Sequence, residues 1–248
     1  MSGHSKWSTI KRKKAAVDAK RGKIFTRLLR EIQVAAKMGG ASPDANPRLR
    51  SAVQAAKAQS VPNDNIDKAI KRGSGSLEGV DYEEIMYEGY GPGGVAILVK
   101  TLTDNKNRTA ADVRSTFSRY GGNMGSANSV AYLFKEKGIV SLPIGLVTED
   151  ELLSLALDAG ASDVKAEGDF WQVECEPTSF EQVRAALSKL SDKLEGEIRL
   201  AADTNTLVKG SDAQNLLKLL DMLDELDDVQ NVVTNFSMDD AELELYSK

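Results

Sequence analysis

The first third of the chain alternates apolar and polar residues with the period of an amphipathic helix. The clearest segment runs from Lys23 to Met38. At about 100° per residue, one side of it collects apolar positions at Ile24, Phe25, Leu28, Leu29, Ile32 and Ala36. Asn46 before Pro47 is typical of an N-cap followed by proline at the first helical position. The pattern predicts helices over residues 10–20, 23–38, 47–59 and 63–73, with breaks at Gly22, Gly39-Gly40 and Pro62.

After Tyr82 the pattern becomes a mixture of strand-like and helical segments. Strands are expected over residues 83–87, 95–101, 130–134, 138–142, 171–176 and 197–202. Helices are expected over residues 109–120, 149–159, 180–190 and 212–226. The sequence therefore predicts a multidomain α+β protein, with an N-terminal helical bundle and two ferredoxin-like α+β sandwich domains, each a sheet with two helices on one face.

The order of these elements suggests that one sandwich is inserted in the other. Residues 135–205 contain a complete β-α-β-α-β unit, so the last helix and strand, within residues 212–236, are left to complete the sandwich that begins at residue 76. Residues 73–76, Gly-Ser-Gly-Ser, have linker composition. We expect a helical domain at residues 1–75, an α+β domain at 76–134 plus 206–248, and an inserted α+β domain at 135–205.

Charge is distributed unevenly between these regions. The net charge of −5 taken alone argues against binding to nucleic acid. Residues 1–75, however, hold 17 lysines and arginines against five acidic residues, whereas the remainder holds 15 against 32. The two regions therefore present surfaces of opposite sign, which indicates different tasks.

The helix from Lys23 to Met38 carries its cations opposite its apolar side. Lys23, Arg27, Arg30 and Lys37 fall within roughly 80° of each other, and Glu31 is the only acidic residue of the helix. Such a face is either solvated or neutralised by a polyanion, and the basic neighbouring segments favour the second interpretation. Cations that neutralise phosphates set position on a nucleic acid but do not read its bases.

The segments on either side extend this candidate phosphate-binding surface. The first predicted helix has few apolar residues and is marginal alone, so it is either a basic arm that orders on a polyanion or a solubilising tail. Trp7 is placed either to stack on a base or to staple that helix. Lys68, Lys71 and Arg72 add further positive charge. The candidate nucleic-acid-binding residues are Lys6, Trp7, Lys11, Arg12, Lys13, Lys14, Lys20, Arg21, Lys23, Arg27, Arg30, Lys37, Arg48 and Arg50.

Two segments rich in glycine or asparagine are weaker candidates for ligand binding than the basic helices. Residues 89–94 satisfy G-x-G-x-x-G, but a strand-like run follows where a dinucleotide site needs a helix, so a wide turn between strands is preferred. Residues 104–109 lie between a strand and a helix, with Asn107 or Asp104 as the expected N-cap. Lys106 and Arg108 are secondary candidates for phosphate contacts.

No catalytic or metal-binding arrangement is evident from residue types and spacing. His4 is the only histidine, and Cys175, the only cysteine, is expected to be a buried structural thiol. We therefore expect no enzyme activity and no cofactor. A cytoplasmic location is expected from the single cysteine, the polar N-terminus and the absence of a membrane-length apolar run.

An acidic run lies at the end of the leucine-rich helix near the C-terminus, at Asp221, Asp224, Glu225, Asp227 and Asp228. A solvated surface is the preferred interpretation. It could also meet a basic protein partner, repel nucleic acid so that binding stays on the N-terminal domain, or hold a divalent metal.

Several local motifs together resemble the YebC family, also known as the PmpR-type regulators. The matching segments are Gly3–Trp7, Asp18–Phe25, Asn46–Arg50, Tyr87–Gly94, Asn107–Thr109 and Asp227–Gln230, and the resemblance covers nearly the full length. The chain differs from the family near Lys11 to Lys13, where a histidine is usual, and in the loop from Ala201 to Gly210.

The resemblance implies three domains, a helical one and two α+β domains with one inserted in the other. It also implies DNA-binding transcriptional regulation in some members. In others it implies ribosome-associated translation activation, including relief of stalling at proline-rich stretches. The mitochondrial relative is the translational activator of cytochrome c oxidase subunit I. The residues alone indicate a regulator without enzyme activity that binds a polyanion, and they do not point to a membrane. Together with the resemblance, they lead us to expect a DNA-binding transcriptional regulator of the YebC type. One alternative is a ribosome-associated translation factor that binds ribosomal RNA or tRNA, and another is a protein-interaction scaffold that meets a basic protein partner through the acidic α+β half.

Overall fold

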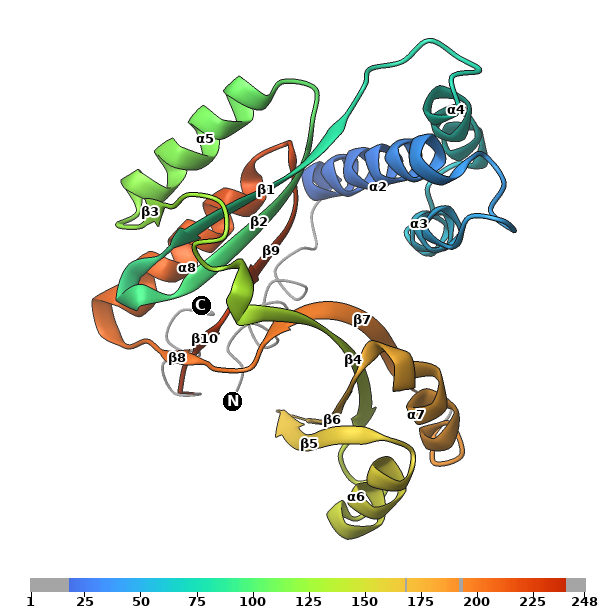
Figure 1. Ribbon diagram of the computed structural model, residues 1–248, viewed down its shortest axis with the longest axis vertical. Helices are drawn as coiled ribbons and strands as arrows, with labels where there is room; N and C mark the ends of the chain where they lie inside the picture. The colour runs from blue at the N-terminus through green and yellow to red at the C-terminus, as the bar shows by residue number, and fades with distance from the viewer. Residues whose placement is uncertain (1–17, 168, 192–193, 240–248) are drawn as a thin grey trace.

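The computed structural model describes residues 18–167, 169–191 and 194–239, with side chains described from Gly22 onward. Its first unit consists of three helices: α2 (Asp18–Gly39), α3 (Pro47–Ala58) and α4 (Asn63–Gly73). Figure 1 shows α3 and α4 gathered at one end of α2. Their shared core is small and rich in alanine: Ile32, Ala35, Ala36, Leu49, Ala52, Ala56, Val61, Ile66 and Ala69.

Close packing within this helical unit depends on two small features. A Cβ atom at Gly73 would lie 2.1 Å from the carbonyl oxygen of Gln33, so α4 can approach α2 only with glycine there. The side chain of Asn46 accepts a hydrogen bond from Leu49 N at 3.0 Å, as an N-cap does, and donates to the carbonyl oxygens of Ala35 and Gly40. The N-cap expected at Asn46 is therefore confirmed.

The break predicted at Gly22 is wrong, because α2 runs through it from Asp18. A glycine inside a helix costs only about 0.5–1 kcal/mol relative to alanine. No proline reinforces the break, and the N-terminal half of α2 packs against another part of the chain, as described below. The rest of the predicted first helix lies outside the described residues.

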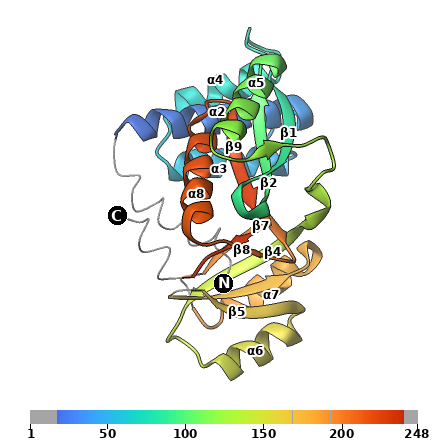
Figure 2. The ribbon, with the colours of Figure 1, turned by 90° about the vertical axis from the view of Figure 1, so that its left-hand side faces the viewer.

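The two four-stranded sheets are named after their sandwiches, and the sheet of the larger sandwich has the strand order β3-β1-β2-β9 and is antiparallel throughout. Its strands are β1 (Glu83–Tyr90), β2 (Ala96–Thr103), β3 (Asn123–Met124) and β9 (Val229–Thr234). One face is covered by α5 (Lys106–Arg119) and α8 (Gly210–Glu225), which lie side by side in Figures 1 and 2. Val113 and Phe117 of α5 and Leu216, Leu219 and Leu220 of α8 are fully buried in the core between these helices and the sheet.

The sheet of the smaller sandwich has the strand order β5-β6-β4-β7 and is also antiparallel. Its strands are β4 (Phe134–Pro143), β5 (Ala161–Glu167), β6 (Phe170–Cys175) and β7 (Glu195–Ala202). Helices α6 (Glu149–Asp158) and α7 (Phe180–Leu187) cover one face. The sequence of elements, β-α-β-β-α-β, and this strand order are those of a ferredoxin-like sandwich.

Short elements complete the chain: the 3-10 helices η1 (Pro92–Gly94), η2 (Ala131–Leu133) and η3 (Pro177–Ser179), and a two-stranded sheet of β8 (Thr206–Leu207) and β10 (Phe236–Ser237). The protein is thus a multidomain α+β structure with a helical N-terminal unit, as predicted. In the described part of the chain, no helix is long and apolar enough to span a membrane.

The smaller sandwich is inserted between β3 and α8 of the larger one. The chain enters it on β4 and leaves it on β7, and these strands pair at Phe134 and Ala202, so entry and exit are adjacent. An apolar seam joins the two sandwiches across the helix-free face of the larger sheet. Its buried members are Ala96, Leu98, Val130, Phe134 and Val233, with Leu200 and Ala202 packed against them.

Two strand predictions differ from the structure. The strand expected at 130–134 is wrong, because residues 131–133 form the 3-10 helix η2. The strand expected at 138–142 begins earlier, at Phe134, because Gly138 continues β4 beneath the ring of Phe180 and does not break it. Strand β5 was not predicted, because Ala161–Glu167 is mostly polar and lies at the edge of the sheet, where period-two burial is weak.

Candidate nucleic-acid interface

Part of the predicted phosphate-binding set lies outside the described residues: Lys6, Trp7, Lys11, Arg12, Lys13 and Lys14. Lys20 and Arg21 belong to α2, but their side chains are not among those described. The structure therefore places the remaining candidates, from Lys23 to Arg50 and the secondary pair Lys106 and Arg108.

Three cations of α2 lie along the C-terminal end of α8 and the residues that follow it. Lys23 contacts the carboxylate of Glu225 at 3.2 Å, Arg27 contacts Asp224 at 3.0 Å, and Arg30 contacts Asp228 at 3.0 Å. Each of the three also donates to a backbone carbonyl oxygen, of Glu225, Asp224 and Asp227 respectively. We call this contact the α2–α8 ion-pair array.

This array shows where the acidic run lies. The expectation of a solvated acidic surface is wrong for Asp224 and Asp228, whose side chains are only 15% and 8% exposed against the arginines of α2. Carbonyl oxygens at the end of a helix lack intrahelical partners and carry partial negative charge, so cations are stabilised there. Among the described residues, no group of three or more His, Cys, Asp or Glu side chains is arranged to hold a metal ion.

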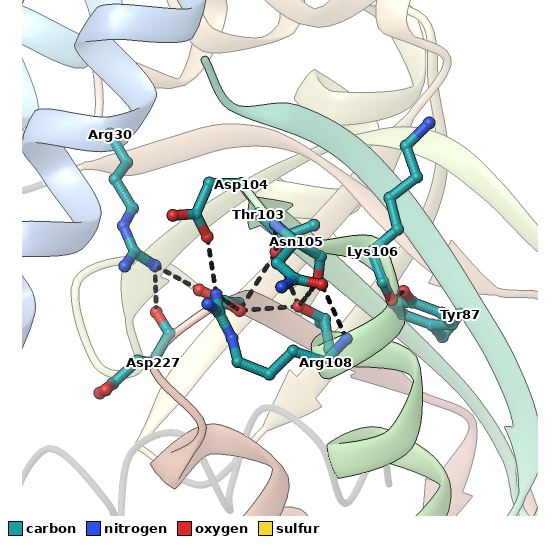
Figure 3. Close-up of polar contacts among 10 residues, drawn as sticks. Arg30, Tyr87, Thr103, Asp104, Asn105, Lys106, Arg108 and Asp227 are labelled. Atoms are coloured by element: carbon teal, nitrogen blue, oxygen red, sulfur yellow. Dashed lines mark hydrogen bonds and ion pairs between the residues drawn. The ribbon is translucent and has the colours of Figure 1, made fainter. Parts of the chain in front are cut away.

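Asp228 is the innermost member of the array and connects three parts of the chain. Its Oδ2 atom accepts hydrogen bonds from Arg108 at 2.7 Å, Thr109 at 2.7 Å and Thr103 at 3.2 Å, while Arg30 contacts Oδ1. Figure 3 shows Arg30 and Arg108 approaching this point from α2 and α5, with Asp104 also paired to Arg108.

These donors set the ionisation of the Asp228 carboxyl. Burial alone would raise its pKa, but hydrogen bonds from Arg108 and Thr109 and the charges of Arg108 and Arg30 outweigh burial and lower the pKa below its ordinary value. Asp228 is therefore a charged, multiply paired carboxylate near neutral pH.

The secondary candidates have intrachain partners as well. Arg108 is shared between Asp104 and Asp228, and its pKa is raised by both carboxylates. Lys106 contacts Glu83 at 2.6 Å. The N-cap of α5 is Asn105, which accepts from Arg108 N at 3.0 Å, so the prediction of Asn107 or Asp104 as the cap is wrong. Asn105 is the residue whose side chain reaches the third amide of the helix.

Further polar contacts hold the helical unit to the connection that precedes β1 and to β1 itself. Arg48 bridges Glu31 at 2.7 Å and Glu84 at 2.6 Å, and Lys37 meets Asp81 at 2.9 Å. The hydrogen bond that Arg48 donates to Glu31 is the largest influence on the guanidinium, and together with the one donated to Glu84 it raises the pKa of Arg48. Gln33 donates to the carbonyl oxygen of Val80.

Five cations on α3 and α4 remain exposed with no ion pair among the described residues: Arg50, Lys57, Lys68, Lys71 and Arg72. On α4, Lys68, Lys71 and Arg72 lie within about 100° of each other, opposite the buried Ile66 and Ala69. On α3, Arg50 and Lys57 are separated by two turns and share one side. We call these five residues the α3–α4 cationic surface. Lys57 was not among the sequence candidates, although its spacing from Arg50 was a usable signal.

The glycine-rich segment 89–94 forms the turn between β1 and β2, as expected, with Gly93 and Gly94 at positive φ. The buried residue beside it is Glu88, whose carboxylate accepts from the backbone amides of Asn128, Val130 and Ala131 at 2.7–2.8 Å. Burial opposes ionisation here, but these amides outweigh it and lower the pKa of Glu88. The sequence pattern did not indicate that the carboxylate of Glu88 binds these amides and so shapes the loop leading into η2.

Cys175 is buried in the core of the smaller sandwich. Its burial, with a smaller contribution from Glu176, raises the pKa of the thiol. A buried thiol with a raised pKa is unreactive, as expected for a structural residue. His4 lies outside the described residues.

Comparison with known proteins places these features in one family. The family pattern described as "TACO1/YebC protein N-terminal domain" matches residues 5–76, and that described as "TACO1/YebC second and third domain" matches residues 82–236. A "Probable transcriptional regulatory protein" of Desulforapulum autotrophicum is 54% identical over 241 residues, covering 97% of this chain and 98% of the relative. One of the same description from Geobacter sulfurreducens is 53% identical over 245 residues, covering 98% and 99%.

A solved structure agrees with the fold. The "Conserved Hypothetical Protein Aq1575" of Aquifex aeolicus superimposes with a TM-score of 0.77 at 43% identity, covering 91% of this chain and 94% of the other. Two family patterns that together span most of the sequence, and relatives identical at more than half of their positions, show that the chain belongs to the YebC family, which the patterns name together with TACO1.

Proposed function

We propose that this protein is a non-enzymatic regulator of gene expression that binds DNA through the α3–α4 cationic surface. The observation that carries the proposal is that Arg50, Lys57, Lys68, Lys71 and Arg72 are exposed and have no acidic partner among the described residues. The relatives named as probable transcriptional regulatory proteins support a regulatory role.

The chemistry of this surface suits a phosphate backbone. Five like charges on two neighbouring helices repel each other, and phosphates relieve that repulsion while releasing counterions. Lysines and arginines of this kind position a protein on DNA without reading sequence. If all five residues contact phosphates, log affinity should fall with log salt with a slope of about −4.5 on duplex DNA.

The test is fluorescence anisotropy with a labelled duplex of about 25 base pairs over a series of salt concentrations. The triple variant Arg50→Ala/Lys57→Ala/Lys71→Ala should lose at least tenfold in affinity, and its salt slope should fall to about −2. The matched control is Arg184→Ala/Lys189→Ala/Lys218→Ala, which removes the same charges from exposed positions outside the helical unit. Equal loss in both variants would overturn the assignment of this surface.

The kind of nucleic acid is tested separately. An RNA duplex of the same sequence, and purified ribosomal large subunits in co-sedimentation, serve as competing targets. Tighter binding to RNA or ribosomes than to any DNA would contradict the DNA part of the proposal and favour a ribosome-associated factor. A promoter regulator should also bind genomic fragments, recovered from cells by crosslinking, more tightly than it binds a duplex of random sequence. Equal competition by random duplex would count against promoter regulation.

A further inference from the structure

The α2–α8 ion-pair array occupies the cations that the sequence pattern offers to a polyanion. Lys23, Arg27 and Arg30 each meet one carboxylate and one carbonyl oxygen at the end of α8. The side chains of Arg27 and Arg30 are only 17% and 15% exposed. In this arrangement a phosphate cannot reach either guanidinium without displacing the acidic residues.

The acidic side of the array resembles a phosphate backbone in the groups that it presents. Residues 224–228 place carboxylate and carbonyl oxygens in a row along α2, at the negative end of the α8 dipole. Guanidinium groups bind carboxylates and phosphates with the same forked geometry, so one set of cations can serve either partner. The two partners therefore compete for the same donors.

The interface that holds α2 against α8 is polar. Among the described residues, the apolar cluster of the helical unit lies within residues 25–70 and that of the larger sandwich within residues 87–238, and the two share no member. The connection between them, residues 74–81, is exposed along its length. Polar interfaces of this kind permit relative movement of domains, because separating the domains exposes little apolar surface to water.

We infer that residues Asp224–Asp228 act as an internal competitor that covers a second polyanion-binding line, Lys23–Arg27–Arg30, and that a nucleic acid bound on the α3–α4 cationic surface displaces them and separates α2 from α8. The inference rests on the proposed function, since it adds a regulated line of contacts to the same binding unit. The apparent affinity is proportional to the fraction of molecules in which the acidic residues are displaced. Weakening the array raises that fraction and therefore strengthens binding.

The outer pairs of the array are the ones to alter, because Asp228 also holds Arg108, Thr103 and Thr109. The variant Asp224→Asn/Glu225→Gln keeps side-chain shape and removes two competing charges. We expect it to bind the labelled duplex about tenfold more tightly than the parent, with a steeper salt slope. The control Asp112→Asn/Asp212→Asn removes two exposed charges from α5 and α8 away from α2, and should change affinity by less than about twofold.

Domain separation is measured directly by energy transfer between dyes on Gln54→Cys of α3 and Gln214→Cys of α8, both exposed, with Cys175 buried. Saturating duplex should lower transfer in the parent, and the Asp224→Asn/Glu225→Gln variant should show lower transfer before duplex is added. If the parent binds through the α3–α4 cationic surface but neither affinity nor transfer responds to these substitutions or to duplex, the internal competitor is wrong and the proposed function stands. If no protein binds DNA or RNA, both are overturned.

Discussion

The two interfaces that join the parts of this molecule are built on opposite principles. The seam between the sandwiches buries Ala96, Leu98, Val130, Phe134 and Val233, each at most 7% exposed. The contact between the helical unit and the larger sandwich consists of ion pairs, hydrogen bonds and the guanidinium of Arg30 lying 5.1 Å from the centre of the Tyr82 ring. Both interfaces contact the larger sheet or its connections, so the contrast lies in chemistry.

That contrast indicates which interface holds its two parts together permanently and which can exchange its partner groups. Apolar burial is non-directional and has no soluble substitute for the lost partner. Ion pairs are weakened by salt, which screens the charges, and a polyanion can take the place of the carboxylates. The sandwiches should therefore move as one body, while the helical unit should respond to salt and to nucleic acid.

The largest effect is expected from truncating the apolar seam. Phe134→Ala removes a buried ring that joins β4 to the larger sheet and should lower the free energy of unfolding by about 3–5 kcal/mol. Urea unfolding followed by circular dichroism measures this. The loss should be the same at about 0.05 and 0.5 M salt, because no charge is involved.

The neighbouring Tyr132→Ala variant is the control, since this side chain is 69% exposed. It should change stability by no more than about 0.5 kcal/mol. A Phe134→Ala loss that shrinks strongly with salt would mean that the seam is not an apolar joint.

A smaller effect is expected at the centre of the ion-pair array. Asp228→Asn leaves Arg30 and Arg108 facing a neutral amide in a site that is 8% exposed, and should cost about 3 kcal/mol. Urea unfolding again provides the measurement. Truncation of a buried pair is costly because the remaining charges lose their partner.

The pH dependence of this difference identifies the charge as its cause. The pKa of Asp228 is lower in the folded protein than the ordinary value of about 3.9, so its contribution is fully present above about pH 4 and is lost as pH falls through the folded pKa. The stability gap between parent and Asp228→Asn should be constant from about pH 7 to 5 and narrow below about pH 4. A gap that persists unchanged in acid would assign the effect to shape.

The smallest effect is expected at the rim of the same interface. Lys37 and Asp81 are 49% and 85% exposed, so Lys37→Ala should change the free energy of unfolding by about 0.5 kcal/mol or less. A loss comparable to that of Asp228→Asn would show that the polar interface draws its strength from its rim, and would weaken the comparison between the two joints.

Most of the fold could be predicted from the sequence because helix caps and amphipathic periodicity depend on residues that are close along the chain. Asn46-Pro47 starts α3 as expected, and the apolar side of α2 packs as expected. The predictions fail where tertiary contacts outweigh local signals. Helix α2 continues through Gly22, β4 continues through Gly138, and the polar strand β5 is held by its pairing with β6.

The candidate site was harder to predict because its partners are distant in sequence. The spacing of Lys23, Arg27 and Arg30 indicates a cationic line but not what faces it, and Asp224 lies 197 residues beyond Arg27. The opposite charges of the two runs were a usable signal, but their spacings were not, because Lys23, Arg27 and Arg30 meet Glu225, Asp224 and Asp228 in an order that differs from the order along the chain. Whether a nucleic acid meets these residues depends on a second molecule, which a single sequence does not describe.

The long separation between the two sides of the ion-pair array has a consequence during synthesis. The cations of α2 precede their acidic partners by 197–202 residues. At about 5–20 residues per second, α2 therefore exists for about 10–40 s before residues 224–228 are made. Throughout that time, on a ribosome surrounded by RNA phosphates, Lys23, Arg27 and Arg30 lack the carboxylates that they meet in the folded protein, and only synthesis of residues 224–228 supplies them.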